Sequence, residues 1–416
     1  MQRRVALLAV IALSAFSVAA AGQSLSQRGF AEGCLFLFPE PASNDPVRVI
    51  GDALVREDVF VKAAPWIQFA GGVDLRASSH DEVDERWTID ASDRGVRRPR
   101  LSVRRASATM ARAWLTVDVG KQFIRWGKTD IVTPTDRFAP RDFVRVVDID
   151  FIAVTGARAV VQLGGDTLDL VWVPRFTPSR IPLPNQRWTV IPSQAEGVPI
   201  VNQSAAMPSG SQTGARWSHV GEYLEYSASF FNGFNHLPNI NANARWTAEP
   251  LSVEIDVTRV YPALRAYGAD AAVPTRWFTV KGEASYFTSK TASADEYVLY
   301  VIQLERQSGE WLFVGGYAGE IVTERRAAMT FAPDRGLARS FVGRASYTID
   351  PNRTVAVEGV VRQNGQGVWA TAEYSEARGA HWRVTAKGSL IRGDADDFLG
   401  QYRLNSHVTL ALRYSF

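Results

Sequence analysis

The last sixteen residues of the chain, 401–416, alternate between apolar and polar side chains. One side carries Tyr402, Leu404, Ser406, Val408, Leu410, Leu412, Tyr414 and Phe416, and the other carries Gln401, Arg403, Asn405, His407, Thr409, Ala411, Arg413 and Ser415. A period of two predicts a β-strand. The run is longer than the about 9 to 11 residues that a transmembrane strand needs, and it ends on an aromatic residue. A soluble β-sandwich also alternates, so the rest of the chain has to decide between the two.

The same alternation recurs along the chain, with short Gly-containing links between some runs and long polar loops between others. This order is typical of an up-and-down membrane barrel, which has tight turns at one end and long loops at the other. We therefore predict an all-β fold, a transmembrane antiparallel β-barrel of about sixteen strands, within a range of about 16 to 18. The runs are 66–76, 113–126, 157–163, 167–173, 214–220, 223–231, 251–260, 264–273, 276–289, 296–306, 311–323, 338–349, 354–364, 367–377, 380–393 and 401–416.

The first residues predict export. Residues 1–21 have a basic start at Arg3 and Arg4, an apolar run and small residues at Ala19 and Ala21, as a secretory signal peptide does. The mature chain is then either soluble outside the cytoplasm or crosses a membrane as a barrel, and for the barrel we expect the outer membrane of a Gram-negative envelope. Residues 22–65 are irregular and predict a periplasmic or intraluminal segment, and residues 66–416 predict the barrel.

Charge and motifs give no support for catalysis or nucleic acid binding. Without Arg3 and Arg4 the 46 basic residues become 44, against 43 acidic ones, so the chain is nearly neutral. The five histidines are scattered, Cys34 is the single cysteine, and no G-x-S-x-G motif occurs. We therefore expect no enzyme activity, no cofactor, no metal and no nucleic acid partner.

The predicted barrel is wide enough to leave a lumen, so its inward-facing charges become candidates for the pore wall. Acids come mostly from the first two-thirds of the chain and bases from the last strands, which suggests two arcs and a field across the pore. The alternative is that these charges pair with an inserted segment and hold a plug. The candidates are Asp118, Gln122, Asp169, Glu225, Glu254, Asp256, Lys281, Glu283, Arg344, Arg362, Arg383, Lys387, Arg403 and Arg413.

Two long segments without alternation, 127–152 and 174–213, are candidates for loops that fold inward and narrow the lumen. The second has seven prolines and could equally be a flexible extracellular loop. The constriction-loop candidates are Asp130, Asp136, Arg141, Asp142, Arg180, Arg187 and Trp188.

The segment GKQFIRWGKTDIVTPTDRFAPRD, residues 120–142, resembles a strand end and inward loop of alginate-export-like porins and related outer-membrane barrels. The resemblance implies a porin-like or export role. The sequence thus predicts a channel for small polar or anionic solutes, with a lipid-transport barrel or a plugged structural barrel as alternatives. Expected partners are outer-membrane lipid with lipopolysaccharide, the barrel-assembly machinery through Phe416, and the solute. A homo-oligomer is a further possible assembly of this barrel.

Overall fold

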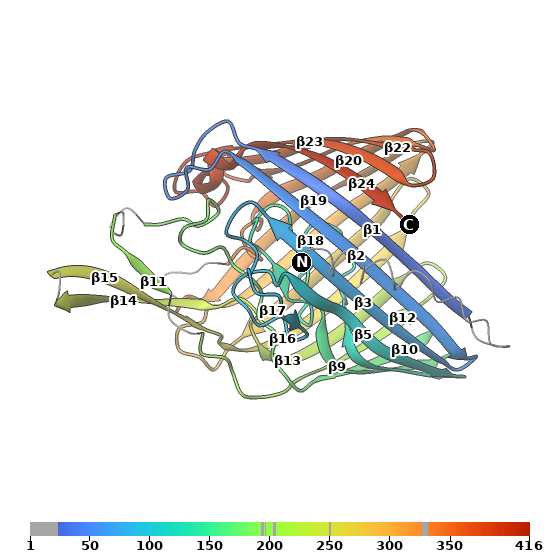
Figure 1. The fold of residues 1–416 in the computed structure, drawn as a ribbon. Helices are drawn as coiled ribbons and strands as arrows, with labels where there is room; N and C mark the ends of the chain where they lie inside the picture. The colour runs from blue at the N-terminus through green and yellow to red at the C-terminus, as the bar shows by residue number, and fades with distance from the viewer. Residues whose placement is uncertain (1–23, 193–194, 196, 203–204, 249–250, 327–331) are drawn as a thin grey trace.

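The computed structural model describes residues 24–416 apart from 193–194, 196, 203–204, 249–250 and 327–331. The predicted signal peptide, 1–21, lies outside the described residues. One antiparallel sheet closes on itself as a barrel (Figure 1). This sheet has 19 strands, one of which, β4 (Ile89–Asp90), is a two-residue strand in a loop, so the wall has 18.

The wall strands follow the order of the chain, and each pairs with its neighbours in antiparallel register. They are β1 (Ser24–Leu37), β2 (Val49–Ala64), β3 (Ile67–Ser78), β5 (Leu101–Arg112), β6 (Leu115–Gln122), β9 (Val154–Leu163), β10 (Asp166–Val173), β12 (Gln212–Val220), β13 (Glu225–Phe234), β16 (Ala263–Pro274), β17 (Thr279–Thr288), β18 (Glu296–Ser308), β19 (Trp311–Glu324), β20 (Ser340–Asp350), β21 (Arg353–Arg362), β22 (Gly367–Arg378), β23 (Trp382–Gly393) and β24 (His407–Ser415).

The wall has more strands than the central value of sixteen. Fifteen of the sixteen predicted runs are wall strands, and β1, β2 and β5 were not predicted as strands of the wall. The sixteenth run, 251–260, lies outside the wall. The expectation that residues 22–65 form a separate periplasmic or intraluminal segment is wrong, since β1 and β2 are wall strands. Their inner face carries buried apolar residues such as Phe36 and Ile50, which hides the alternation. β5 was not predicted as a strand because its three arginines mark it as a basic segment, and a register shift near Arg104 and Arg105 interrupts its alternation.

The outer surface of the wall is apolar. Along β24 the exposed residues are Val408, Leu410, Leu412 and Tyr414, while the residues between them are covered on the inner side. The same holds for Phe341, Val357 and other residues of the last strands. A closed barrel satisfies its backbone hydrogen bonds internally, so this exposed apolar surface suits contact with hydrocarbon.

The two ends of the barrel differ. At one end, which we call the turn end, links of a few residues join neighbouring strands, and both β1 and β24 have their terminal residues there. Exposed tryptophans gather at this end, as in the aromatic girdle of a membrane interface. They are Trp66, Trp114, Trp277, Trp311 and Trp382. The opposite, loop end carries the long connections and a short 3-10 helix, η4 (Gly400–Asn405). No helix among the described residues is long and apolar enough to span a membrane.

A small sheet stands outside the wall at the loop end. The hairpin β14 (Asn239–Ala248) and β15 (Leu251–Val260) projects away from the barrel and pairs with β11 (Ile200–Asn202) (Figure 1). The run 251–260 was expected in the wall. That expectation is wrong because β15 pairs with β14 and β11, and among the described residues it pairs with no wall strand. A hairpin with one solvated face alternates as a membrane strand does.

The barrel closes between its first and last strands. β1 pairs with β24 from Phe30 opposite Ser415 to Leu37 opposite Val408. Beyond this ladder, the backbones of Gly29 and Phe416 exchange two hydrogen bonds of 3.0 Å each. A Cβ atom at Gly29 would lie 2.2 Å from the Glu57 carboxylate and 2.4 Å from the Phe416 ring, so a larger residue at this point of the seam would require both side chains to move.

Candidate functional site

Residues 123–153 leave the wall after β6 and return to it at β9; we call them the crossing loop. β6 and β9 are adjacent strands. The loop nevertheless reaches β17 and β18, because the backbone of Thr129 binds Glu283 on β17 and that of Asp130 binds Gln303 on β18. The crossing loop therefore spans the lumen from one arc of the wall to another.

The carboxylate of Glu283 is the main anchor of the crossing loop. It accepts hydrogen bonds from the backbone N–H groups of Lys128 (2.8 Å), Thr129 (2.9 Å) and Thr135 (2.8 Å) and from both threonine hydroxyls (2.8 Å each). Its side chain is buried. A carboxylate with five donors is held in one position, since hydrogen bonds to a charged acceptor are about twice as strong as neutral ones.

A second carboxylate shapes the start of the crossing loop. Asp136 accepts hydrogen bonds from the backbone N–H groups of Trp126 (2.6 Å) and Gly127 (2.7 Å). The indole N–H of Trp126 donates to Asp169 on β10 at 2.9 Å. Asp136 thus folds the loop back on itself, and Asp169 fixes the folded part to the wall.

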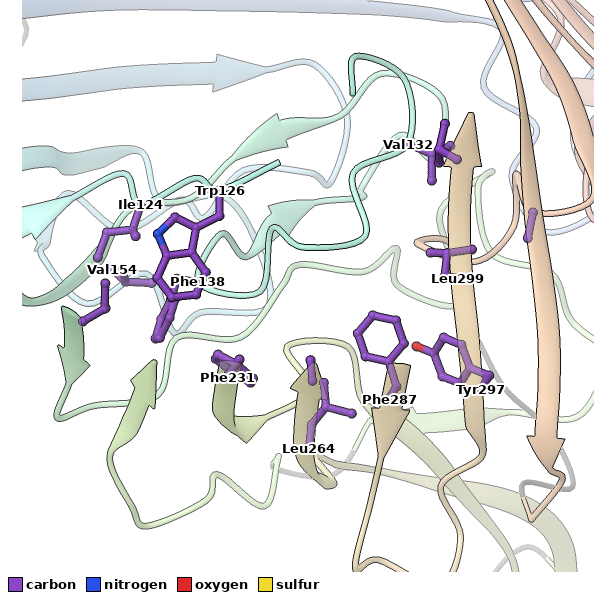
Figure 2. Packing of buried hydrophobic residues seen from close by; sticks show 14 of the residues in the cluster. Ile124, Trp126, Val132, Phe138, Val154, Phe231, Leu264, Phe287, Tyr297 and Leu299 are labelled. Atoms are coloured by element: carbon purple, nitrogen blue, oxygen red, sulfur yellow. The ribbon is translucent and has the colours of Figure 1, made fainter. Parts of the chain in front are cut away.

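Apolar side chains fill the space between the crossing loop and the wall. Figure 2 shows Phe231 of β13 below Phe138 and Trp126 of the loop, with Leu264 of β16 next to it and Phe287 of β17 beside Tyr297 of β18. The ring of Phe138 meets the rings of Trp126 and Phe231 edge to face, at 5.2 and 4.9 Å between centroids. This packing leaves this part of the lumen closed to water, because the cluster is buried throughout.

Buried ion pairs join three loops near the loop end. Arg98 contacts Glu82 and Asp142 at 2.9 Å each, Arg145 contacts Glu82 at 2.8 Å, and Arg180 lies 3.4 Å from Asp142. Burial raises the pKa of the Asp142 carboxyl, but Arg98 and Arg180 lower it further, and the net pKa lies below its ordinary value. Asp142 is therefore ionised and holds the end of the crossing loop through two arginines.

The described part of the second long loop, 174–211, also lies against the interior. Arg187 donates to the Asn405 side chain at 2.9 Å and to the carbonyl of Val47 at 2.6 Å, and burial lowers the pKa of its guanidinium to about 10. Trp188 is 1% exposed. These contacts tie this loop to the first and last connections at the loop end.

The remaining lumen contains two neighbouring cavities, of about 420 and 340 Å³, which both border Val147 of the crossing loop. Their walls come from the crossing loop and from β18 to β24 and β1. We call this part of the lumen the open side. The packed part against β3 to β17, together with the loop-end residues of β18 and β19, is the filled side. The charged residues that line the two cavities are Glu32, Asp130, Asp148, Glu305, Arg344, Glu358, Glu373, Arg383, Lys387 and Arg413.

Acids and bases are interspersed on the open side. Arg344 on β20 lies directly opposite Glu358 on β21, and Glu373 on β22 lies opposite Lys387 on β23. Arg413 on β24 contacts Glu32 on β1 at 2.7 Å. The separation of acids and bases into two arcs is therefore wrong, because the last strands carry acids that the prediction left out.

Several predicted pore residues lie on the filled side or at the bottom of the lumen with a partner each. Asp118 accepts from Thr109, Gln122 donates to two carbonyls at 3.3 Å, Asp169 contacts Arg158 at 2.7 Å, Glu225 contacts Lys128, and Lys281 contacts Glu305 at 2.6 Å and Asp130 at 3.3 Å. The contacts of Glu225 with Lys128 and of Lys281 with Asp130 fit the alternative that wall charges hold an inserted segment, whereas the other contacts lie within the wall.

Four other predicted residues lie away from both cavities. Glu254 and Asp256 are on β15, outside the wall, where they contact Arg245 at 2.6 and 3.0 Å. Arg403 is exposed on η4, since the last strand begins only at His407. Arg362, at the loop end of β21, contacts Asp397 at 2.9 Å and holds the loops there.

The constriction candidates also divide. Asp130 borders the open side, whereas Asp136, Asp142 and Arg180 serve as internal links. Arg141 binds Thr133 within the crossing loop, and Arg187 and Trp188 hold the loop end.

The prediction missed Glu32, Asp148, Glu305, Glu358 and Glu373. Glu358 and Glu373 had a usable signal, because they share the inward parity of their alternating runs. Glu32 could not be placed without recognising β1. Among the described residues, no group of three or more His, Cys, Asp or Glu side chains is arranged to hold a metal ion.

No family model matches the chain, and no curated protein matches it in sequence. The resemblance to alginate-export-like porins therefore finds no support. Solved structures share the fold across nearly the whole chain. OpdQ of Pseudomonas aeruginosa is 11% identical with a TM-score of 0.53, covering 95% of this chain and 99% of its own. A BenF-like porin from Pseudomonas fluorescens Pf-5 is 10% identical with a TM-score of 0.55, covering 95% and 98%. OccAB1 of Acinetobacter baumannii is 9% identical with a TM-score of 0.54, covering 95% and 97%.

Proposed function

We propose that the protein is an outer-membrane, porin-like channel that lets small polar or anionic solutes cross through the open side of its lumen. The observation that carries this proposal is the pair of cavities, about 420 and 340 Å³, bordered by ten charged side chains inside a closed apolar barrel. A wall of charges is of use where water and solutes pass, since burying them dry would be costly.

The apolar exterior and the tryptophans at the turn end support a membrane location. We infer that the turn end faces the periplasm, that the loop end faces lipopolysaccharide, that residues 1–21 direct export, and that the barrel-assembly machinery binds the strand that ends at Phe416. The porins with the same fold support the channel by analogy of architecture alone.

A specific observation favours a second candidate, a plugged structural barrel. The filled side is packed by an apolar cluster and buried ion pairs, so the crossing loop is fixed within the lumen. A lumen blocked by this loop at every height would not conduct. A barrel of a lipid-transport system would be silent in the same way.

Conductance of the purified protein in a planar lipid bilayer tests the channel. The expected result is stepwise single-channel current in potassium chloride, with liposome swelling in small neutral sugars. A stably inserted protein without current would overturn the channel and leave the plugged barrel. Insertion is checked independently by resistance of the wall to protease and by the mobility change of the folded barrel on heating.

A further inference from the structure

The open side contains two pairs of opposite charges that face each other without touching. Arg344 and Glu358 are direct neighbours on β20 and β21, and Glu373 and Lys387 on β22 and β23. Side chains in such positions start from Cβ atoms about 4.5 to 5.5 Å apart. Within the described part of the chain, neither pair forms an ion pair, although all four side chains border the cavities.

Other opposite charges on the wall do make contact, either between adjacent strands or across one intervening strand. Arg158 and Asp169 lie 2.7 Å apart, Arg216 and Asp270 lie 2.9 Å apart, and Arg413 and Glu32 lie 2.7 Å apart. Arg344, Glu358 and Glu373 have no hydrogen-bond partner among the described residues, and Lys387 comes only within 3.8 Å of Asp148. The two unclosed pairs are therefore a distinct feature of the open side.

We propose that these unclosed pairs recognise zwitterionic solutes of the amino-acid type, an inference that rests on the channel function proposed above. An anion without a positive group is attracted by Arg344 and repelled by Glu358. A cation without a negative group is attracted by Glu358 and repelled by Arg344. A molecule that carries both an ammonium and a carboxylate group satisfies both side chains, and the guanidinium binds the carboxylate through two N–H groups.

The surroundings of the first pair indicate the rest of the solute. The cavity beside Arg344 and Glu358 is also lined by Leu312, Val314 and Trp369, and its volume is about 340 Å³. These apolar side chains suit an apolar group on the solute. The cavity beside Glu373 and Lys387 is lined mainly by polar residues. The structure thus assigns the first pair to amino acids with an apolar side chain, and the second pair to the zwitterionic head as it moves on.

Three matched probes test the assignment: leucine, the cation leucinamide and the anion N-acetylleucine. Liposome flux through the wild-type protein is measured with each. The expected result is roughly fivefold faster uptake of leucine than of either charged probe at low concentration, as one retained charge-assisted contact would give. Equal rates for all three probes in a conducting channel overturn the inference and leave the channel intact. An inserted protein without current overturns both.

Two variants separate recognition from general electrostatics. Arg344→Gln is expected to favour leucinamide and Glu358→Gln to favour N-acetylleucine, each with loss of the leucine preference. The same test on the second pair covers the case in which a β20 or β21 variant does not fold. Lys387→Gln is expected to favour leucinamide, and Glu373→Gln is expected to favour N-acetylleucine. Arg403→Gln, on the exposed η4, is the control with unchanged flux. A leucine preference that survives in both Arg344→Gln and Lys387→Gln overturns the proposal.

Discussion

The filled side and the open side of the lumen are built from the same kind of strand but use their inward charges in opposite ways. On the filled side, Glu283 and Asp169 take donors from the crossing loop. On the open side, Arg344 and Glu373 remain without such partners among the described residues. The difference shows that an inward charge becomes a structural anchor where a loop reaches it and a lining group where none does.

The sharpest way to break this comparison is to remove the anchor at Glu283. Glu283→Ala leaves five donors of the crossing loop without their acceptor, and each buried donor without a partner costs about 1 to 3 kcal/mol. The loop is expected to detach, and single-channel conductance to rise severalfold with noisier currents. Glu376→Ala on the outward face of β22 is the control. An unchanged conductance would contradict the anchoring role.

The buried ion pairs give the next largest effect. Arg98→Ala leaves Glu82 and Asp142 without their shared cation, which costs about 3 to 5 kcal/mol for a buried pair. We expect a lower thermal unfolding midpoint and faster proteolysis of the crossing loop, with conductance changed less than in Glu283→Ala. The exposed Arg86, paired with Asp84 at 2.6 Å, offers a matched control in Arg86→Ala, which should alter neither reading.

A charge reversal compares the open side with the outside of the wall. Arg413→Glu places two carboxylates, at positions 413 and 32, where a contact of 2.7 Å existed, so cation preference should increase. The measurement is the reversal potential in a potassium chloride gradient. We expect a shift of about 10 mV or more if the charges beside Arg413 and Glu32 line the conducting path. Arg403→Glu should leave it unchanged. Equal shifts in both would show a surface effect only.

The smallest expected effect concerns pH and the loop end of the filled side. His236 is buried between the carbonyls of Thr177 and Arg137, at 2.6 and 3.0 Å, and burial lowers the pKa of its imidazole to about 4. Because the folded pKa lies below the unfolded value of about 6.5, the neutral form stabilises the fold above pH 6.5. This contribution is lost as the pH falls from about 6.5 to 4.

Thermal unfolding midpoints at pH 7 and pH 4.5 check this prediction. The wild type is expected to lose a few degrees more than His236→Gln over this interval, while conductance through the open side stays the same in both. If the variant shows the same pH dependence as the wild type, other groups control acid stability.

The sequence predicted the wall strands in which only the outward face is apolar. It did not predict the strands in which apolar residues on the inner face hide the alternation. The alternation at 401–416 led to β24 because its outward residues are all apolar from Val408 onward. β1 and β2 were missed because Phe36 and Ile50 fill the interior. The run 251–260 misled, since a hairpin in water has the same period. Fifteen of the sixteen predicted runs are otherwise wall strands.

The site was predictable in part. Parity alone placed Arg344, Lys387 and Arg413 toward the lumen, as the structure does. It could not tell which wall charges the crossing loop would cover, because Glu283 and Thr135 are 148 residues apart in the chain. Long-range contacts of this kind follow from how the loop folds, and no local pattern encodes them.

The seam between Gly29 and Phe416 has a consequence for how the molecule is made. β24, the last strand of the wall, has to pair with β1 to complete the ring, so every stage before that pairing exposes two unpaired strand edges. A chain in which β24 has not yet paired with β1 would thus offer its backbone to any neighbouring strand, and closure of the barrel removes that hazard.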